Sequence, residues 1–266
     1  MPYRHAHWYL LSLFPLAGLA FWPSYVSKFA DSPAAFHVHG ITASLWIALV
    51  ALQSWSIHRH RNALHRSIGL GSFALFPFFV AGGLLVVHSI AGKFATAADP
   101  FSAMYGARLG FMDTLSTVAI LYLFGMALKW RRKVHLHARY MVAPILFLLS
   151  PILGRLPPVL PFGEPSLERF AVIVQLANGI AIAVAAILYL RAPGHGRPFL
   201  VAGGVVAVQS LGFLTLGRTV AWERLFAAIA ALPVSAVASL GIAAGLAAIW
   251  TGWIAGRAPP RALAPA

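Results

Sequence analysis

Eight apolar runs separated by short polar turns constrain this sequence more than any other feature. Each run approaches or exceeds the roughly 20 residues that a helix needs to cross the hydrocarbon core of a bilayer. Only 10% of the residues are charged and 60% are hydrophobic, whereas a soluble domain carries roughly 25% charged residues. Such a chain cannot cover its surface with polar groups, so lipid must be its outer solvent. The predicted spans are 8–27, 38–57, 67–91, 108–128, 140–157, 169–190, 199–217 and 227–254.

These runs predict an all-α fold, a polytopic transmembrane helix bundle of about eight spans. No long polar segment divides the chain, so we expect residues 1–266 to form a single integral membrane domain. Most histidines fall within or beside a core of about 36–157, and the C-terminal spans of about 169–254 contain only His195. No small-residue cleavage site follows the first apolar run, which therefore predicts a membrane span and not a signal peptide.

The charged residues divide the turns into two sets that alternate along the chain. One set holds thirteen of the 20 basic residues and no acid, and the other holds the remaining seven together with all six acids. The positive-inside rule assigns the first set to the cytoplasm, which leaves both termini inside. The basic residues of the first set are Arg4, Arg59, Arg61, Arg66, Lys129, Arg131, Arg132, Lys133, Arg139, Arg191, Arg197, Arg257 and Arg261. The acids of the second set are Asp31, Asp99, Asp113, Glu164, Glu168 and Glu223.

The net charge of +14 does not indicate a nucleic-acid partner. The basic residues lie in the turns, where they meet lipid headgroups. We expect a multi-pass protein of the cell inner membrane, with the lipid bilayer as its surroundings and no nucleic acid bound. The chain has no cysteine, which excludes disulfides, thiolate metal sites, iron–sulfur clusters and c-type haem.

The eleven histidines lie at predicted helix ends, with none at mid-membrane. Residues seven apart on a helix share a face, so His39, Trp46 and Gln53 should form one stripe that faces the bundle interior. Further inward stripes begin at His65 and His137. The stripe of His65 contains small residues, which leave room either for a neighbouring helix or for a flat cofactor.

A pair of histidines on facing helices suits a b-type haem, because neutral imidazole is a good ligand for haem iron. His65 and His137 begin spans on the same predicted side. Arg66 and Arg139 lie next to them in the sequence and carry the charge that binds haem propionates. We expect these four residues to bind haem b. The alternative for each histidine is contact with lipid phosphate, helix carbonyls or water.

A second group of polar residues falls on the opposite side of the predicted bundle. His39, His88 and Asp113 supply two imidazoles and one carboxylate, a ligand set typical of non-haem iron. The alternative is a structural role, in which Asp113 forms an ion pair with Arg155.

Part of the sequence resembles a family of uncharacterised polytopic bacterial membrane proteins, which is itself similar to transmembrane b-type cytochromes and ferric-reductase-like bundles. The residues that carry the resemblance are His39, Gln53, the run His65-Arg66-x-x-Gly69, the run His137-x-Arg139-Tyr140-Met141, and Arg155. The match covers about residues 36–157 and implies a helical bundle whose histidines bind haem. The chain departs from b-type cytochromes that carry two histidines 13–14 residues apart on one helix, since His65 and His88 would lie about 34 Å apart.

These patterns favour a haem-b-binding integral membrane redox protein, either an electron-transfer protein or a quinone-linked cytochrome. Its partner would be a quinone or another membrane redox protein. One alternative is a cofactor-free membrane transporter or assembly subunit, although no inverted repeat is visible. A second alternative is a histidine/carboxylate metal-dependent membrane enzyme that acts on lipid, although the chain has only His-x-His pairs. The sequence leaves open whether the protein is an enzyme.

Overall fold

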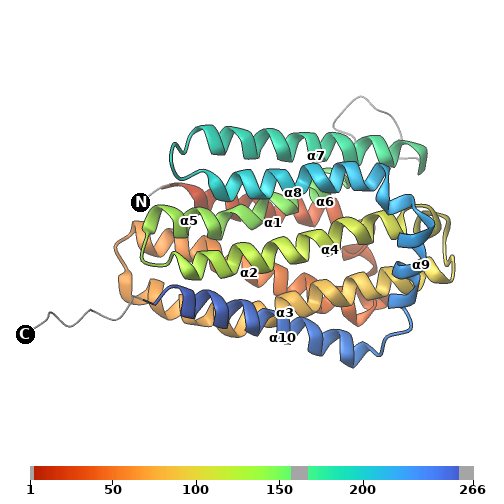
Figure 1. The fold of residues 1–266 in the computed structure, drawn as a ribbon, viewed down its shortest axis with the longest axis horizontal. Coiled ribbons are helices and arrows are strands. Elements are labelled where there is room, and N and C mark those ends of the chain that lie inside the picture. The colour runs from red at the N-terminus through yellow and green to blue at the C-terminus, as the bar shows by residue number, and fades with distance from the viewer. Residues whose placement is uncertain (1–2, 157–166, 258–266) are drawn as a thin grey trace, which may run out of the picture.

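The computed structural model describes residues 3–156 and 167–257, and these residues form a bundle of helices without β-strands (Figure 1). The all-α prediction is therefore confirmed. Arg261, Glu164 and position 157, the predicted end of the fifth span, lie outside the described residues. The elements in chain order are α1 (Ala6–Phe21), η1 (Val26–Asp31), α2 (Ala34–His58), α3 (Asn62–Ala95), α4 (Pro100–Lys129), α5 (Val134–Val142), η2 (Ala143–Ile145), α6 (Leu146–Leu153), α7 (Leu167–Leu190), α8 (Arg197–Leu214), η3 (Leu216–Arg218), α9 (Val220–Ile229) and α10 (Val234–Ala255).

Seven helical segments in the described residues are long and apolar enough to cross a membrane. They are α2, α3, α4, the continuous stretch from α5 to α6, α7, α8 and α10. The eighth segment, α1, has 16 residues and is about 24 Å long, shorter than a hydrocarbon core of about 30 Å. We predicted this span to continue to residue 27, but α1 ends at Phe21. Trp22 still has helical dihedral angles, but Pro23 has no backbone N–H with which to continue the helical hydrogen bonds.

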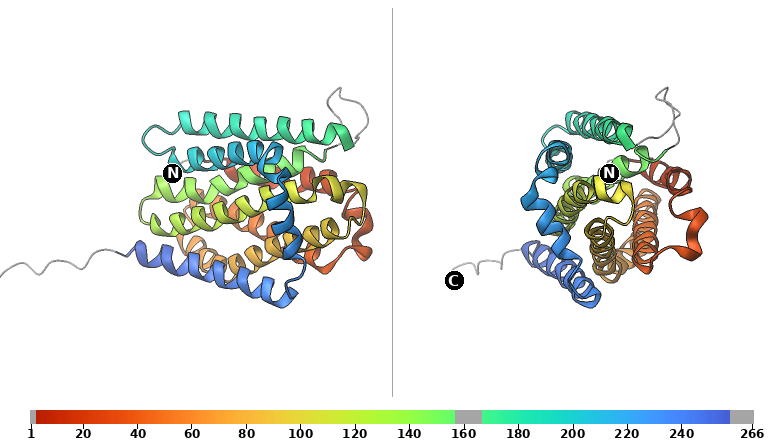
Figure 2. Two further views of the ribbon diagram at one scale, coloured as in Figure 1. Left: turned by 45° about the vertical axis from the view of Figure 1, so that its right-hand side comes forward. Right: turned by 90° about the vertical axis from the view of Figure 1, so that its right-hand side faces the viewer.

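The predicted eighth span is wrong at its start. Residues 220–229 form a separate helix, α9, and the long helix α10 begins only at Val234, directly after Pro233. Helix α9 crosses the end of the bundle at a steep angle to its neighbours (Figure 2). It is held there by Phe226, which is fully buried, and by Trp222, whose Nε1 donates a hydrogen bond to Ala107 O at 2.7 Å.

The turns alternate between the two ends of the bundle, as their charges predict. The turns 58–62, 129–134 and 190–197 lie at one end with the start of α1 and the end of α10 (Figure 1, left). Contacts join them there: the rings of His135 and His195 are 5.4 Å apart, and Arg131 Nη1 donates to Trp253 O at 3.0 Å. We call this the basic end and the opposite one the outer end. The start of α1 and the end of α10 thus lie at the same end of the bundle.

Cysteine labelling tests the orientation of these ends. Because the native chain has no cysteine, a single cysteine at Ala97, in the exposed turn between α3 and α4, gives an unambiguous signal. We expect Ala97→Cys to react with a membrane-impermeant thiol reagent in intact cells, and Val134→Cys, at the basic end, to react only after the cells are opened. Labelling of Val134→Cys but not Ala97→Cys in intact cells would invert the topology.

The centre of the bundle is packed with aromatic rings from three helices. Trp46 of α2 stacks on Phe79 of α3 with centroids 5.7 Å apart, and it meets Phe124 of α4 edge-on at 5.2 Å. Phe76 lies 4.0 Å from Phe124 between centroids. The trio α2, α3 and α4 thus forms a rigid core, around which α1, α10 and the pair α7–α8 are placed (Figure 2).

Helix α10 approaches this core closely because it presents glycines to it. A Cβ at Gly241 would collide with the backbone of Ala81, and one at Gly245 would lie 2.6 Å from Pro77 Cα. Both partners belong to α3. Small residues four apart allow two helix backbones to approach in a membrane, where no hydrophobic effect drives helices together.

Candidate functional site

The structure brings His65 and His137 together at the basic end. His65 lies in the first turn of α3 and His137 in the first turn of α5. Both imidazoles are half-buried and close enough to interact electrostatically. Helix α4 packs against both α3 and α5, so it holds the two helices that carry the histidines in place relative to each other.

A hydrogen bond fixes the tautomer of His137. Its Nδ1 lies 2.9 Å from Ala127 O in α4. A carbonyl oxygen can only accept, so Nδ1 carries the proton and Nε2 of the neutral ring keeps its lone pair. Histidines that bind metals are oriented in the same way, by a hydrogen bond from the ring nitrogen that does not touch the metal. His137 therefore has the arrangement of a ligand that acts through Nε2.

Gln53 of α2 joins this pair of histidines. Its Nε2 donates to His65 O at 3.0 Å, and Gly69 makes room for it, since a Cβ there would lie 3.3 Å from that nitrogen. At this position the small residue thus admits a neighbouring helix. Two atoms, Gln53 Oε1 and His65 Nδ1, are buried without a hydrogen-bond partner among the residues that the structure describes. An unpaired buried polar atom costs roughly 1–3 kcal/mol of folding stability. A ligand that forms a hydrogen bond with either atom would recover part of that free energy.

The two predicted arginines do not join the histidine pair. Arg139 follows His137 by two residues, which is about 200° around the helix. It is buried on the other face of α5, where Nη1 donates to His135 O at 2.9 Å and Cζ lies 5.5 Å from the centre of the Tyr3 ring. Arg66 is exposed at the surface of the basic end. Of the four predicted haem-binding residues, the structure therefore groups only the histidines.

The predicted stripe on α2 faces the bundle interior, as its spacing indicates. Trp46 is 3% exposed and Gln53 is 9% exposed, and the ring of His39 stacks on Phe79 at 6.2 Å. Gly82 of α3 allows this close approach, because a Cβ there would lie 3.0 Å from His39 Cα. His39 Nδ1 and Trp46 Nε1 are also buried without hydrogen-bond partners. Unpaired polar atoms thus continue from the outer half of α2 to its basic end.

The predicted metal ligands of the outer end are not gathered into one site. His88 turns toward the loop before α10, where Nε2 donates to Leu232 O at 3.0 Å. His39 lies against α3 from the side of α2, as described above. Within the described ranges, no three histidine, aspartate or glutamate side chains are close enough to hold a metal ion. The structure therefore does not assemble His39, His88 and Asp113.

Asp113 and Arg155 lie near each other and interact electrostatically. For these two described residues, the structure shows neither a hydrogen bond nor an ion pair between them. Arg155 Nη1 instead donates to Pro151 O at 3.1 Å, and its Cζ lies 5.0 Å from the centre of the Phe21 ring. Asp113 is thus the nearby countercharge of a guanidinium that is held by a helix carbonyl and an aromatic ring.

The sequence analysis missed Gln209, a polar residue that links α8 to the core. Gln209 of α8 is buried, and its Nε2 donates to Met112 O at 2.6 Å and to Ser116 Oγ at 2.7 Å, both on α4. Gln175 of α7 is joined to Ser210 of α8. The only sequence signal was the presence of amides within apolar runs, which does not identify their partners.

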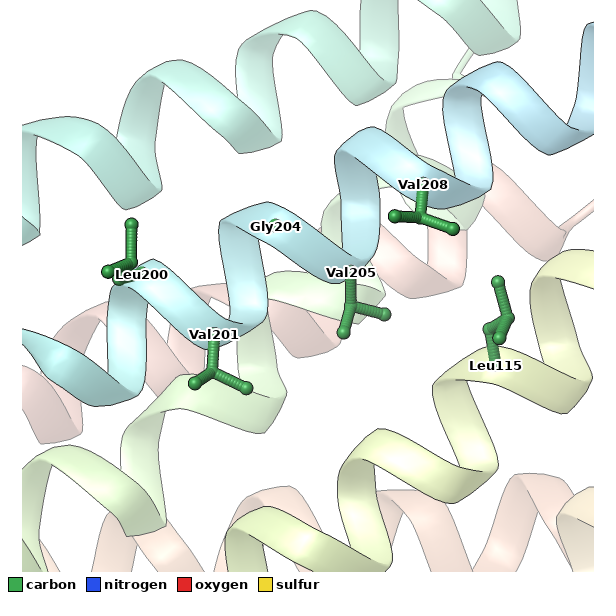
Figure 3. Close-up of a pocket in the computed structure, with 6 residues that line it drawn as sticks. All are labelled: Leu115, Leu200, Val201, Gly204, Val205 and Val208. Atoms are coloured by element: carbon green, nitrogen blue, oxygen red, sulfur yellow. The ribbon is translucent and has the colours of Figure 1, made fainter.

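An apolar groove on the outside of the bundle offers no chemistry. It has a volume of about 590 Å³ and lies between α4 and α8. Figure 3 shows aliphatic side chains and one glycine around it: Leu115, Leu200, Val201, Gly204, Val205 and Val208. This groove is suited to lipid chains.

No protein-family model matches the sequence of this chain, and no curated protein or solved structure matches the chain.

Proposed function

We propose that this multi-pass membrane protein is a redox protein that binds a b-type haem through His65 and His137. The observation that carries the proposal is that His137, whose Nδ1 proton is held by Ala127 O, lies within electrostatic range of His65 at the same end of the bundle. A haem between two imidazoles carries one electron at a time as its iron changes between the ferric and ferrous states. The unpaired Gln53 Oε1 and His65 Nδ1 also fit a place that a bound group completes.

The residues of the chain have separate roles in this proposal. His65 and His137 would bind the haem through ring nitrogens, and Gln53 positions His65 through its backbone carbonyl. Arg66 is the predicted arginine that remains available for a propionate, because it is exposed at the same end. Arg139 has a different role, since it joins α5 to Tyr3. The electron partner would be a quinone or another membrane redox protein, in the inner membrane of a bacterium.

Visible spectra test this proposal directly. The full chain is expressed with haem supplied, purified in detergent, and its dithionite-reduced-minus-oxidised spectrum is recorded. We expect wild type to show the α-band of a bis-histidine haem, and His65→Ala and His137→Ala to lose it. His88→Ala is the matched control, because His88 contacts Leu232 O at the outer end, and it should keep the band.

Two outcomes would contradict the proposal at different levels. If the wild-type protein is folded, as judged by its elution as one species, and shows no such band, the proposal that it binds haem is refuted. Retention of the band in both His65→Ala and His137→Ala would preserve haem binding and refute the ligand assignment. As a further check, haem should dissociate as the pH falls through the histidine range, because imidazole must be neutral to bind iron.

A cofactor-free transporter is the second candidate, and one observation favours it. Asp113 and Arg155 place opposite charges within the bundle on α4 and directly after α6. Ionisable groups within membrane spans often mark the path of an ion or a polar substrate. Wild-type protein that folds without haem would make this the leading proposal, with Asp113 as the first residue to replace in transport assays.

A further inference from the structure

A second cavity opens at the basic end, between the start of α1 and the end of α2. Its volume is about 610 Å³. Neither His65 nor His137 lines it, so it is separate from the candidate haem site. Eleven residues surround it: Arg4, His5, His7, Trp8, Leu11, Ala48, Ala51, Leu52, Trp55, His58 and Arg59.

One half of this cavity is built to meet negative charge. Arg4 and Arg59 are exposed at its mouth, and three histidines accompany them. None of the residues around the cavity is acidic. An anion that enters here would therefore meet cations only. Charge-assisted hydrogen bonds from arginine to phosphate are among the strongest and most directional in proteins.

Two imidazole nitrogens in this half have no acceptor or donor in the described chain. His58 Nδ1 lies 2.7 Å from Ser54 O, so it carries a proton, while His58 Nε2 is buried without a partner. His7 Nδ1 is also buried without a partner, and His7 interacts electrostatically with both His58 and Arg59. The oxygens of an anionic group at this position would accept a hydrogen bond from either of these nitrogens when it carries a proton.

The other half of the cavity is apolar and faces the lipid. Trp8 is 65% exposed, Leu11 is 43% exposed and Leu52 is 42% exposed, all on helix faces that no other helix covers. Trp55 is held in place on the opposite wall by Arg61, whose Cζ lies 4.8 Å from the centre of its ring. The cavity therefore runs from a cationic mouth to an apolar surface that is continuous with the membrane interior.

We propose that this cavity binds one anionic phospholipid of the surrounding leaflet. Its phosphate would lie between Arg4 and Arg59, and an acyl chain would follow Trp8, Leu11 and Leu52. Free phosphate shares the chemistry of the mouth, but it would leave the apolar half empty. A neutral quinone would use the apolar half and leave the two arginines unpaired. An anionic lipid uses both halves at once.

Native mass spectrometry of the full chain released from detergent micelles tests this site. Phosphatidylglycerol and phosphatidylcholine with identical acyl chains are added at equal concentration. We expect wild type to retain one phosphatidylglycerol in preference to phosphatidylcholine. Arg4→Gln/Arg59→Gln should weaken that retention about 30-fold. Each juxtamembrane basic residue raises the affinity for anionic lipid about fivefold, and the variant removes two of them. Ala48→Phe, which fills the cavity and keeps its charge, should also abolish it.

The matched control is Arg132→Gln/Arg191→Gln, which removes two exposed arginines of the same end that do not line the cavity. It should retain the lipid as wild type does. Equal retention of both lipids by wild type, or equal losses in the two double variants, would overturn the site. If inorganic phosphate displaces the lipid from wild type, and Ala48→Phe still retains phosphatidylglycerol, the mouth of the cavity binds free phosphate instead. Preferential retention of added quinone would likewise refute an anionic ligand.

Discussion

Replacing Asp113 by Asn should lower the free energy of unfolding by about 3–5 kcal/mol. The substitution leaves the Arg155 guanidinium inside the bundle without its countercharge, and an uncompensated buried charge is among the costliest defects in a protein. Arg155→Gln should have a similar effect through the isolated carboxylate. The double variant should cost less than the sum of the two, because it removes both charges together. Unfolding of the purified protein in mixed detergent measures all three values.

Asp31→Asn is the control for this cycle. Asp31 is also an acid of the outer end, but it is exposed, and substitutions at such places change stability by less than about 0.5 kcal/mol. If Asp113→Asn and Arg155→Gln each unfold like wild type, the electrostatic interaction does not contribute to the fold. If the two effects add without interaction, each charge is stabilised by other partners.

Replacing Gly241 or Gly245 by Ala should destabilise the protein by about 1–3 kcal/mol each. The new methyl groups meet backbone atoms of Ala81 and Pro77, which cannot rotate away as side chains do. Helix α10 must then move off α3, and a double substitution should cost less than the sum of the two, because one displacement relieves both clashes. Loss of folded yield and a lower Tm would report this displacement.

Gly71→Ala is the matched control, because no atom lies within 4 Å of a Cβ at that position. An alanine there should be neutral or slightly stabilising, since alanine favours helix more than glycine by about 1 kcal/mol. If Gly241→Ala behaves like Gly71→Ala, the close contact of α10 with α3 does not exist in the membrane.

The apolar runs were sufficient to predict the helices, but not all of their ends. Length and hydropathy identify a run, whereas a proline decides where the helix stops. Pro23 ended α1 early, and Pro233 separated α9 from the predicted last span. Pro144 acted more locally: it introduced the short 3₁₀ segment η2 between α5 and α6, because proline has no backbone N–H to donate.

The candidate site was predictable where it depended on spacing along one helix. The stripe of His39, Trp46 and Gln53 follows from a seven-residue repeat alone. The two-residue spacing also indicates that Arg139 cannot share a helix face with His137. Periodicity could not identify Tyr3 as the aromatic partner of Arg139. The cavity between α1 and α2 was missed for the same reason, because contacts between helices depend on the packing of the whole bundle.

The separation of charge between the two ends also fixes how the chain can enter a membrane. In the described residues, the basic end carries twelve basic side chains and no acid, and the outer half carries seven basic and five acidic ones. Inverting the molecule would move an excess of about ten positive charges against the membrane potential, at roughly 2.3 kcal/mol per charge for 100 mV. A protein whose two ends carry equal numbers of basic residues would lack this preference. The charges of this chain favour one orientation, so we expect any homodimer that it forms within the bilayer to be parallel.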